Sequence, residues 1–135
     1  MLVKVTDRLW LSSEPNLAMV RRSGADAVLC CIKKGSPQEV IDAVPEYHRF
    51  DLPDGKTFPE DLFMEAVTQA QQWLAEGRTV LVHCRAGRNR SATVVAMVLI
   101  LQGVDPADAI AYVRKLRPRA IANPVMEERL LKGAL

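Results

Sequence analysis

The segment from residue 79 to residue 101 limits what this chain can fold into more than any other part. An apolar run, Thr79 to Val82, is followed by a short loop with one glycine and then by a second apolar run, Ala92 to Leu101. The first run is short and contains β-branched residues, which predicts a strand buried on both faces of a parallel sheet. The second predicts the central part of a helix from Ser91 to about Gln102, buried because it is apolar almost all round.

The rest of the chain continues this alternation of strands and helices. Two short strands are expected around Asp7-Arg8, and two more at Ala27–Ile32 and Tyr47–Leu52. Further helices are expected at residues 13–22, 36–43, 58–76 and 105–117 and from Asn123 onward, with Ser13, Asp105 and Asn123 as N-caps. We therefore expect one α/β domain over residues 1–135, with a central, mostly parallel sheet flanked by helices.

Some positions in these helices have a clear expected environment. Trp73, Ala66 and Ala70 recur with the helical period within residues 58–76, which predicts a core-facing stripe. The charged run Glu127-Glu128-Arg129 predicts an exposed helix face.

The loop between the buried strand and the buried helix has the composition of an anion site. Ligands bind α/β sheets beyond the C-terminal ends of the strands, and the loop after Val82 is such a place. Gly87 permits a positive φ, so the loop can turn its N–H groups inward, and the helix start adds further N–H groups. Arg90 offers a planar fork for two phosphate oxygens. The predicted phosphate-binding residues are Arg85, Ala86, Gly87, Arg88, Asn89 and Arg90.

Cys84 stands at the floor of this predicted cup. Surrounding N–H groups and cations lower a cysteine pKa and favour the thiolate, which is the nucleophilic form. The Ser91 hydroxyl is placed to stabilise that thiolate, and His83 is expected to orient the loop with its side chain turned away from Cys84. The alternative is a buried core cysteine beside solvated arginines. The combination of residue types at fixed spacing favours the catalytic interpretation.

These residues, His83-Cys84, then Arg90-Ser91, resemble the His-Cys-x5-Arg-Ser/Thr signature of the protein tyrosine phosphatase superfamily. The short chain is similar to the dual-specificity branch, and the less specific flanks, Asp7 to Ser12 and Asn123-Pro124, also resemble it. The resemblance implies hydrolysis of phosphotyrosine and phosphoserine/threonine through a phosphocysteine intermediate. It implies neither a metal nor any other cofactor.

The resemblance also implies a carboxylic acid on a loop upstream of the cysteine. Expelling the leaving oxygen requires a proton donor, which neither the thiolate nor an arginine provides. Asp54, in the stretch Leu52-Pro53-Asp54-Gly55, is the expected general acid. Asp51 is the next candidate, although it is expected to end a strand. The alternative interpretation of Asp54 is that it serves only as a turn residue, since Pro-Asp-Gly is a common turn. Glu60 and Asp61 are expected in the first turn of the next helix.

Two other activities fit parts of the loop. The pattern Cys84-Arg85-Ala86-Gly87-Arg88 resembles that of superfamily members that act on phosphoinositides or phosphatidylglycerophosphate, where added cations suit a second phosphate. A non-catalytic phosphate-binding module would also keep the cup, but it would not need Cys84 or Asp54. An RNA 5′-triphosphatase is a further relative, but no basic stripe extends beyond the loop.

Composition narrows the partners and the compartment. A formal net charge of +2 is too small to favour nucleic acid or an anionic membrane surface. The N-terminus lacks the pattern of a secretory signal, and the run Ala92–Leu101 is shorter than the roughly 20 residues of a membrane span. We expect a cytoplasmic monomer that acts on a phosphorylated protein or a small phosphoester.

The three cysteines, Cys30, Cys31 and Cys84, are too few and too unevenly placed for a disulfide framework, which fits a reducing compartment. The adjacent pair Cys30-Cys31 is expected on a sheet strand, one side chain on each face. The simple interpretation is two small buried hydrophobes. In the alternative, one of the two forms a reversible disulfide with an oxidised Cys84, which requires Cα atoms within about 7 Å.

Overall fold

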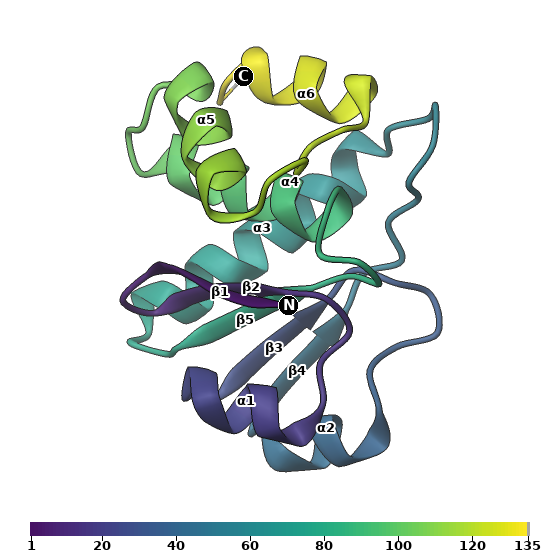
Figure 1. The fold of residues 1–135 in the computed structure, drawn as a ribbon, viewed down its shortest axis with the longest axis vertical. Coiled ribbons are helices and arrows are strands. Elements are labelled where there is room, and N and C mark those ends of the chain that lie inside the picture. The colour runs from purple at the N-terminus through teal and green to yellow at the C-terminus, as the bar shows by residue number, and fades with distance from the viewer. Residues whose placement is uncertain (135) are drawn as a thin grey trace.

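A five-stranded sheet forms the centre of the protein in the computed structural model, which describes residues 1–134 (Figure 1). The strand order is β1-β2-β5-β3-β4, with only the β1–β2 pair antiparallel. The strands are β1 (Leu2–Thr6), β2 (Leu9–Ser12), β3 (Ala27–Cys30), β4 (Glu46–Arg49) and β5 (Val80–His83). The sheet therefore has the mostly parallel organisation that the sequence predicted.

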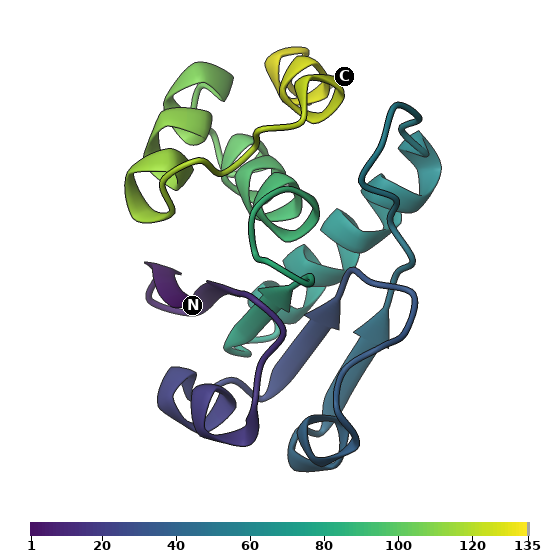
Figure 2. The ribbon, with the colours of Figure 1, turned by 45° about the vertical axis from the view of Figure 1, so that its right-hand side comes forward.

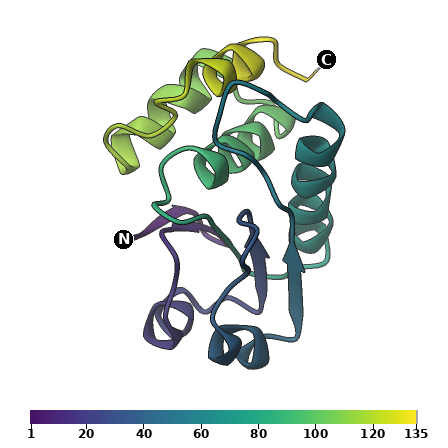
Figure 3. The same cartoon turned by 90° about the vertical axis from the view of Figure 1, so that its right-hand side faces the viewer.

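Helices cover both faces of this sheet. They are α1 (Leu17–Ser23), α2 (Gln38–Ala43), α3 (Glu60–Ala75), α4 (Arg90–Leu101), α5 (Pro106–Leu116) and α6 (Pro124–Leu131). Figures 2 and 3 show α1 and α2 on one face and α3 to α6 on the other, with α5 and α6 outermost. This three-layer arrangement confirms the expected single-domain α/β fold. Within residues 1–134, no helix combines the length and the apolar character that crossing a membrane requires.

The core lies between the sheet and the α3–α4 layer. Strands β3 and β5 are buried at every position, as their continuous apolar sequences predicted. Helix α4 is buried from Ser91 to Ile100, and α3 contributes Ala66, Ala70 and Trp73, all buried. The central helix and the core stripe of α3 are thus confirmed.

Two local predictions were wrong. The N-cap of α1 is Asn16, whose side chain accepts a hydrogen bond from the Met19 N–H, whereas Ser13 accepts one from the N-terminal ammonium. Strand β4 ends at Arg49 rather than at Leu52, because its only partner strand, β3, ends at Cys30. Beyond Cys30 there is no adjacent strand whose backbone could continue the hydrogen bonds to β4, so the chain leaves the sheet.

The predicted exposed face at residues 127–129 was also wrong in part. Arg129 is only 7% exposed and donates two hydrogen bonds, of 2.6 and 2.8 Å, to the Glu60 carboxylate at the start of α3. Glu127 accepts a hydrogen bond from Arg114. A charged residue such as Arg129 is rarely buried unless it is paired. Its partner Glu60 lies 69 positions away in sequence, and the partner of Glu127, Arg114, lies 13 positions away.

Candidate active site

The segment from Cys84 to Asn89, here called the Cys84 loop, joins the end of β5 to the start of α4. Its carbonyl groups are bound from outside by distant parts of the chain. The Arg85 carbonyl accepts from the Glu14 N–H at 3.0 Å, that of Ala86 from the Arg117 side chain at 3.2 Å, and that of Arg88 from the Ile121 N–H at 2.7 Å. With the carbonyls held outward, the N–H groups of Gly87, Arg88 and Ser91 turn inward to the Cys84 sulfur. Inward N–H groups are what an anion nest requires, and phosphate binding by this loop stays a prediction.

Gly87 is required by the close approach of β2 to the loop. Its φ is +66°, in the left-handed region, and a Cβ at this position would lie 2.7 Å from the Ser12 carbonyl carbon. That contact is with backbone, which cannot turn aside as a side chain can. Both conformation and space therefore restrict this position to glycine.

The Cys84 thiol is buried and surrounded by hydrogen-bond donors. Burial alone raises its pKa, but the Ser91 hydroxyl, 3.0 Å from the sulfur, and the inward N–H groups of the loop outweigh burial and lower the pKa below the usual value. The charged form is favoured because each donor hydrogen-bonds the thiolate more strongly than the thiol. The surroundings of Cys84 therefore favour a reactive thiolate.

His83 lies where the sequence placed it, directed away from the Cys84 sulfur. Its Nδ1 is 3.1 Å from the Cys84 carbonyl oxygen, and its Nε2 lies within hydrogen-bond distance of the Ser36 hydroxyl. Burial lowers the pKa of His83 to about 4, so the ring is neutral at pH 7. A neutral, fully buried imidazole between two polar partners holds the loop rather than transferring protons.

A cleft of about 300 Å³ opens above the loop and is lined by Ile32, Lys34, Arg85 and Arg90. The Nε of Arg90 is buried and has no hydrogen-bond partner within residues 1–134, so it is suited to bind an anion. Arg85 lines this cleft as the sequence predicted, whereas Arg88 does not, because its Nε donates to the Arg119 carbonyl at 3.1 Å. In the part of the chain that is described, no three His, Cys, Asp or Glu side chains gather as a metal site requires.

Asp54 lies next to the Cys84 loop although thirty positions separate Asp54 from Cys84 in sequence. Its carboxylate accepts hydrogen bonds from the Asn89 side chain, at 3.1 and 3.3 Å, and from the Asn123 side chain at 3.0 Å. Asp51 is exposed and has no side-chain hydrogen bond within the described residues. Of the two candidate acids, only Asp54 contacts the loop that carries Cys84.

Helix α6 holds residues 51–59, here called the Asp54 loop, at two points. At its N-terminus, Asn123 donates to Asp54 and to the Gly55 carbonyl while its Oδ1 caps α6 by accepting from the Val125 N–H. Near its C-terminus, Arg129 pairs with Glu60, just beyond the loop. Sequence reasoning found Asn123 only as a cap and placed Arg129 on an exposed face. No local signal in either segment indicates the contact.

Cys31 is the cysteine that lies beside Cys84. In the β3–β5 register Cys30 is opposite His83, so the next residue along each strand places Cys31 next to Cys84, and the Cys31 N–H donates to the His83 carbonyl at 2.8 Å. Burial raises the pKa of the Cys31 thiol well above its usual value, and the neighbouring Cys84 raises it further. The disulfide itself stays a prediction, with Cys31 rather than Cys30 as the partner.

The family model described as dual specificity phosphatase, catalytic domain, matches residues 9–132. Among curated proteins, a probable protein tyrosine phosphatase type IVA B of Dictyostelium discoideum is 30% identical over 112 residues, 78% of this chain and 66% of that protein. Phosphatidylglycerophosphate phosphatase PTPMT1 of Arabidopsis thaliana is 41% identical over 63 residues, which is 43% of this chain and 19% of that protein. The chain thus spans less than two thirds of the length of these relatives.

Solved structures share the whole fold. Tk-PTP in its active form superposes with a TM-score of 0.84 at 26% identity and covers 97% of this chain and 93% of its own. PTPMT1 in complex with PI(5)P superposes with a TM-score of 0.82 at 25% identity, over 97% of this chain and 92% of its own. The likeness extends from the Cys84 loop to the outer helices.

Proposed function

Because this chain belongs to the dual-specificity phosphatase catalytic domain family, we propose that it hydrolyses phosphomonoesters through a phosphocysteine formed on Cys84. The substrates proposed first are phosphotyrosine and phosphoserine or phosphothreonine in proteins. The observation that carries the proposal is the Cys84 sulfur within reach of the Ser91 hydroxyl and of inward N–H groups, which lower its pKa.

In the first step, the Cys84 thiolate attacks phosphorus in line with the leaving oxygen. A P–S bond forms as the P–O bond breaks, and Asp54 transfers its proton to the leaving oxygen. Arg90 and the N–H groups of the loop bind the equatorial oxygens of phosphate, where negative charge must be stabilised throughout.

In the second step, water attacks the phosphocysteine. Asp54, now ionised, accepts a proton from the water, the new P–O bond forms and the P–S bond breaks. The thiolate leaves with the Ser91 hydroxyl as its hydrogen-bond donor at 3.0 Å. Inorganic phosphate is released and both residues return to their starting states.

Substitution of the nucleophile and of the acid tests this mechanism. We expect Cys84→Ser to lose more than about 10³-fold in kcat on a chromogenic aryl phosphate, because an alcohol at this position is neither ionised nor a good leaving group. We expect Asp54→Ala to lose about 10²-fold to 10⁴-fold in kcat. Thermal melting of each variant checks that the fold is retained.

Two results would contradict the assignments. Full turnover by Cys84→Ser would remove the phosphocysteine from the mechanism. An unchanged kcat in Asp54→Ala, together with a loss in Asp51→Ala, would transfer the acid role to Asp51. A wild-type protein that binds phosphate but hydrolyses no ester would support the non-catalytic binding module instead.

A second candidate activity, hydrolysis of a phospholipid or phosphoinositide headgroup, is favoured by the cleft itself. Arg85 lines it together with Arg90, so a second cation faces it besides the one that a single phosphate requires, and Lys34, paired with Glu14 at 2.9 Å, lies at the same cleft. The likeness to PTPMT1 in complex with PI(5)P supports the same candidate. Comparison of kcat/KM for phosphopeptides, a phosphoinositide and phosphatidylglycerophosphate separates the two substrate classes, and a higher value for either lipid would favour this second candidate.

A further inference from the structure

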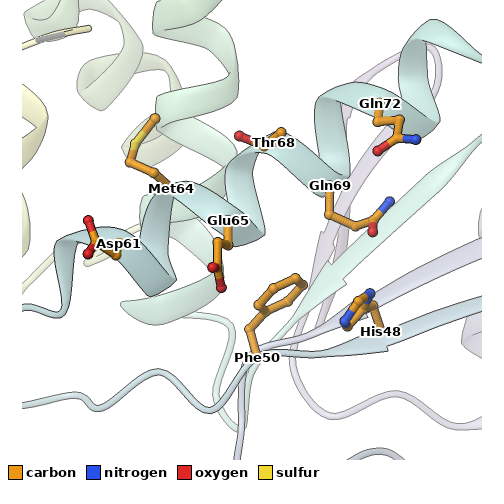
Figure 4. A pocket seen from close by; sticks show the side chains of 8 residues that line it. All are labelled: His48, Phe50, Asp61, Met64, Glu65, Thr68, Gln69 and Gln72. Carbon is orange, nitrogen blue, oxygen red and sulfur yellow. The ribbon is translucent and has the colours of Figure 1, made fainter.

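A second hollow, larger than the cleft above Cys84, lies between α3 and the edge of the sheet. It measures about 650 Å³, and Figure 4 shows the eight side chains that line it. Phe50 and His48 form its floor, with their rings stacked at 4.5 Å, and α3 forms its wall. We refer to it as the β4 groove. None of its lining residues belongs to the proposed catalytic set.

The wall of the β4 groove is acidic. Asp61 and Glu65, one turn apart on α3, are both exposed, and neither has an ion-pair partner within residues 1–134. Glu65 points from α3 toward Phe50 in Figure 4. Asp61, in the first turn of α3, is favoured by the helix dipole, whereas like charges spaced four residues apart on a helix repel each other slightly. The charge of the groove is therefore complementary to a cationic side chain supplied by another molecule.

The floor of the groove ends at a free sheet edge. Strand β4 pairs only with β3, and the Glu46 and Phe50 N–H groups bond toward β3. Alternation along a strand turns the N–H and C=O groups of Tyr47 and Arg49 outward, where they have no partner strand in the described chain. An extended polypeptide pairs with such an edge through its backbone.

The two features are aligned. Side chains at 46, 48 and 50 point to the α3 face of the sheet, so alternate side chains of a strand added beside β4 would point to that same face and enter the groove. A lysine or arginine there would lie close to Glu65 and within one helical turn of Asp61, and its methylene stem would lie on Phe50 (Figure 4). A lipid headgroup offers no backbone to pair with the edge.

We propose that the β4 groove binds an extended, lysine- or arginine-containing segment of a protein partner by strand addition to β4. The groove ends at Phe50, from which the chain runs directly into the Asp54 loop, so the bound segment reaches the active-site edge of the sheet. The partner is a phosphorylated protein substrate, and in this respect alone the inference rests on the proposed function. The groove would then select protein substrates by binding a segment of the substrate that does not include the phosphorylated residue.

Direct binding tests the groove without turnover. The probe is a fluorescent, unphosphorylated peptide that alternates lysine with threonine, and the readout is anisotropy. We expect the double variant Asp61→Asn/Glu65→Gln to weaken binding about fivefold or more, because two ion pairs are lost. The control is Glu39→Gln/Glu128→Gln, which removes the same charge from two exposed carboxylates outside the groove and is expected to leave binding almost unchanged.

Strand addition has its own readouts. The peptide should protect the Tyr47 and Arg49 amides from hydrogen exchange, and methylation of its alternate backbone nitrogens should abolish binding. Absence of binding, equal loss in both double variants, or a peptide that protects neither amide would overturn the inference. A dimer of the free protein that occupies the β4 edge would also overturn it.

Turnover separates this inference from the proposed function. A phosphotyrosine peptide carrying the lysine–threonine segment should show a raised KM in the groove variant, while kcat/KM on a small aryl phosphate stays at the wild-type value. A fall in aryl phosphate turnover in that variant would contradict a binding role confined to the groove. If the wild type hydrolyses no aryl phosphate yet binds the peptide, the proposed function fails and the groove stands.

Discussion

The Cys84 loop and the Asp54 loop supply the two reacting groups of the proposed mechanism, but they are built differently. The Cys84 loop is six residues long, joins a buried strand to a buried helix, and has carbonyls that are hydrogen-bonded to distant parts of the chain. The Asp54 loop is exposed over most of its length and is held by the side chains of Asn89 and of Asn123, the N-cap of α6. Both loops depend on distant residues, but the Cys84 loop is bound through its backbone carbonyls and is crowded at Gly87, whereas the Asp54 loop is bound mainly through the Asp54 side chain.

Because the two loops are held differently, substitutions in them are expected to affect the site in different ways. In the Cys84 loop, a change of one atom meets backbone and disturbs the phosphate site directly. In the Asp54 loop, we expect changes at positions other than Asp54 to be tolerated, while changes at Asn89 or Asn123 should alter the position of the acid.

The largest effect is expected for Gly87→Ala. The added Cβ would lie 2.7 Å from the Ser12 backbone at a left-handed φ, so the loop must shift, and kcat/KM should fall by more than about 10²-fold. The matched control is Gly55→Ala in the Asp54 loop, where a Cβ meets nothing within 4 Å. Equal losses from the two substitutions would show that the loops do not differ as described.

A smaller effect is expected for Ser91→Ala. The hydroxyl helps to lower the pKa of Cys84, so its removal raises that pKa. Since the thiolate is the active form, the acidic limb of the pH profile of kcat/KM should move to higher pH, and kcat should fall about 10-fold to 100-fold. The rate of Cys84 alkylation against pH reports the same pKa independently. An unmoved acidic limb would mean that Ser91 does not act on the thiolate.

Asn123→Ala tests the support of the Asp54 loop and should lower kcat about tenfold, because the acid loses one of its amide donors. The loss should be larger for an alkyl phosphate than for an activated aryl phosphate, whose leaving group needs less protonation. Asn16→Ala removes the matching N-cap of α1, at a similar cost of about 1 kcal/mol in stability, but does not touch either loop. If both variants lose the same kcat, the effect of Asn123 is stability alone.

Glu60→Gln should have a milder effect on the same support. The ion pair with Arg129 becomes a neutral hydrogen bond, so stability should fall by about 1 kcal/mol and kcat by about twofold. Glu46→Gln is the control, because Glu46 is similarly exposed and pairs with Arg78 at the far end of the sheet from the site. If only the control lowered the melting temperature, the ion pair between α6 and Glu60 would not stabilise the protein as proposed.

The last comparison leaves turnover unchanged and concerns the Cys84 loop alone. We expect peroxide to oxidise the Cys84 thiolate to sulfenic acid, after which the Cys31 thiol displaces water to give a disulfide. Cys31→Ser should therefore lose recoverable activity after peroxide and reductant, whereas Cys30→Ser should not. Mass spectrometry of the linked peptides identifies the pair. A disulfide between Cys30 and Cys84 would contradict the inference, drawn from the strand register, that Cys31 is the partner.

The features that depend on neighbouring residues alone could be predicted from the amino-acid sequence. A buried strand, a glycine loop and a buried helix around Cys84 follow from composition and spacing, and so does the mostly parallel sheet. The caps at Asp105 and Asn123 were predicted because capping depends on a few neighbouring residues. The sequence also identified Asp54 and Asp51 as candidate general acids. Apart from the Pro-Asp-Gly turn and the resemblance, no local feature favoured one over the other.

Only the tertiary structure decided which groups meet. It placed Asp54 on the amides of Asn89 and Asn123, buried Arg129 against Glu60, and ended β4 early because β3 ends. It also turned Arg88 away from the cleft and opened a groove beside β4. These outcomes depend on contacts between segments far apart in sequence, and such contacts leave no periodicity or motif in either segment alone.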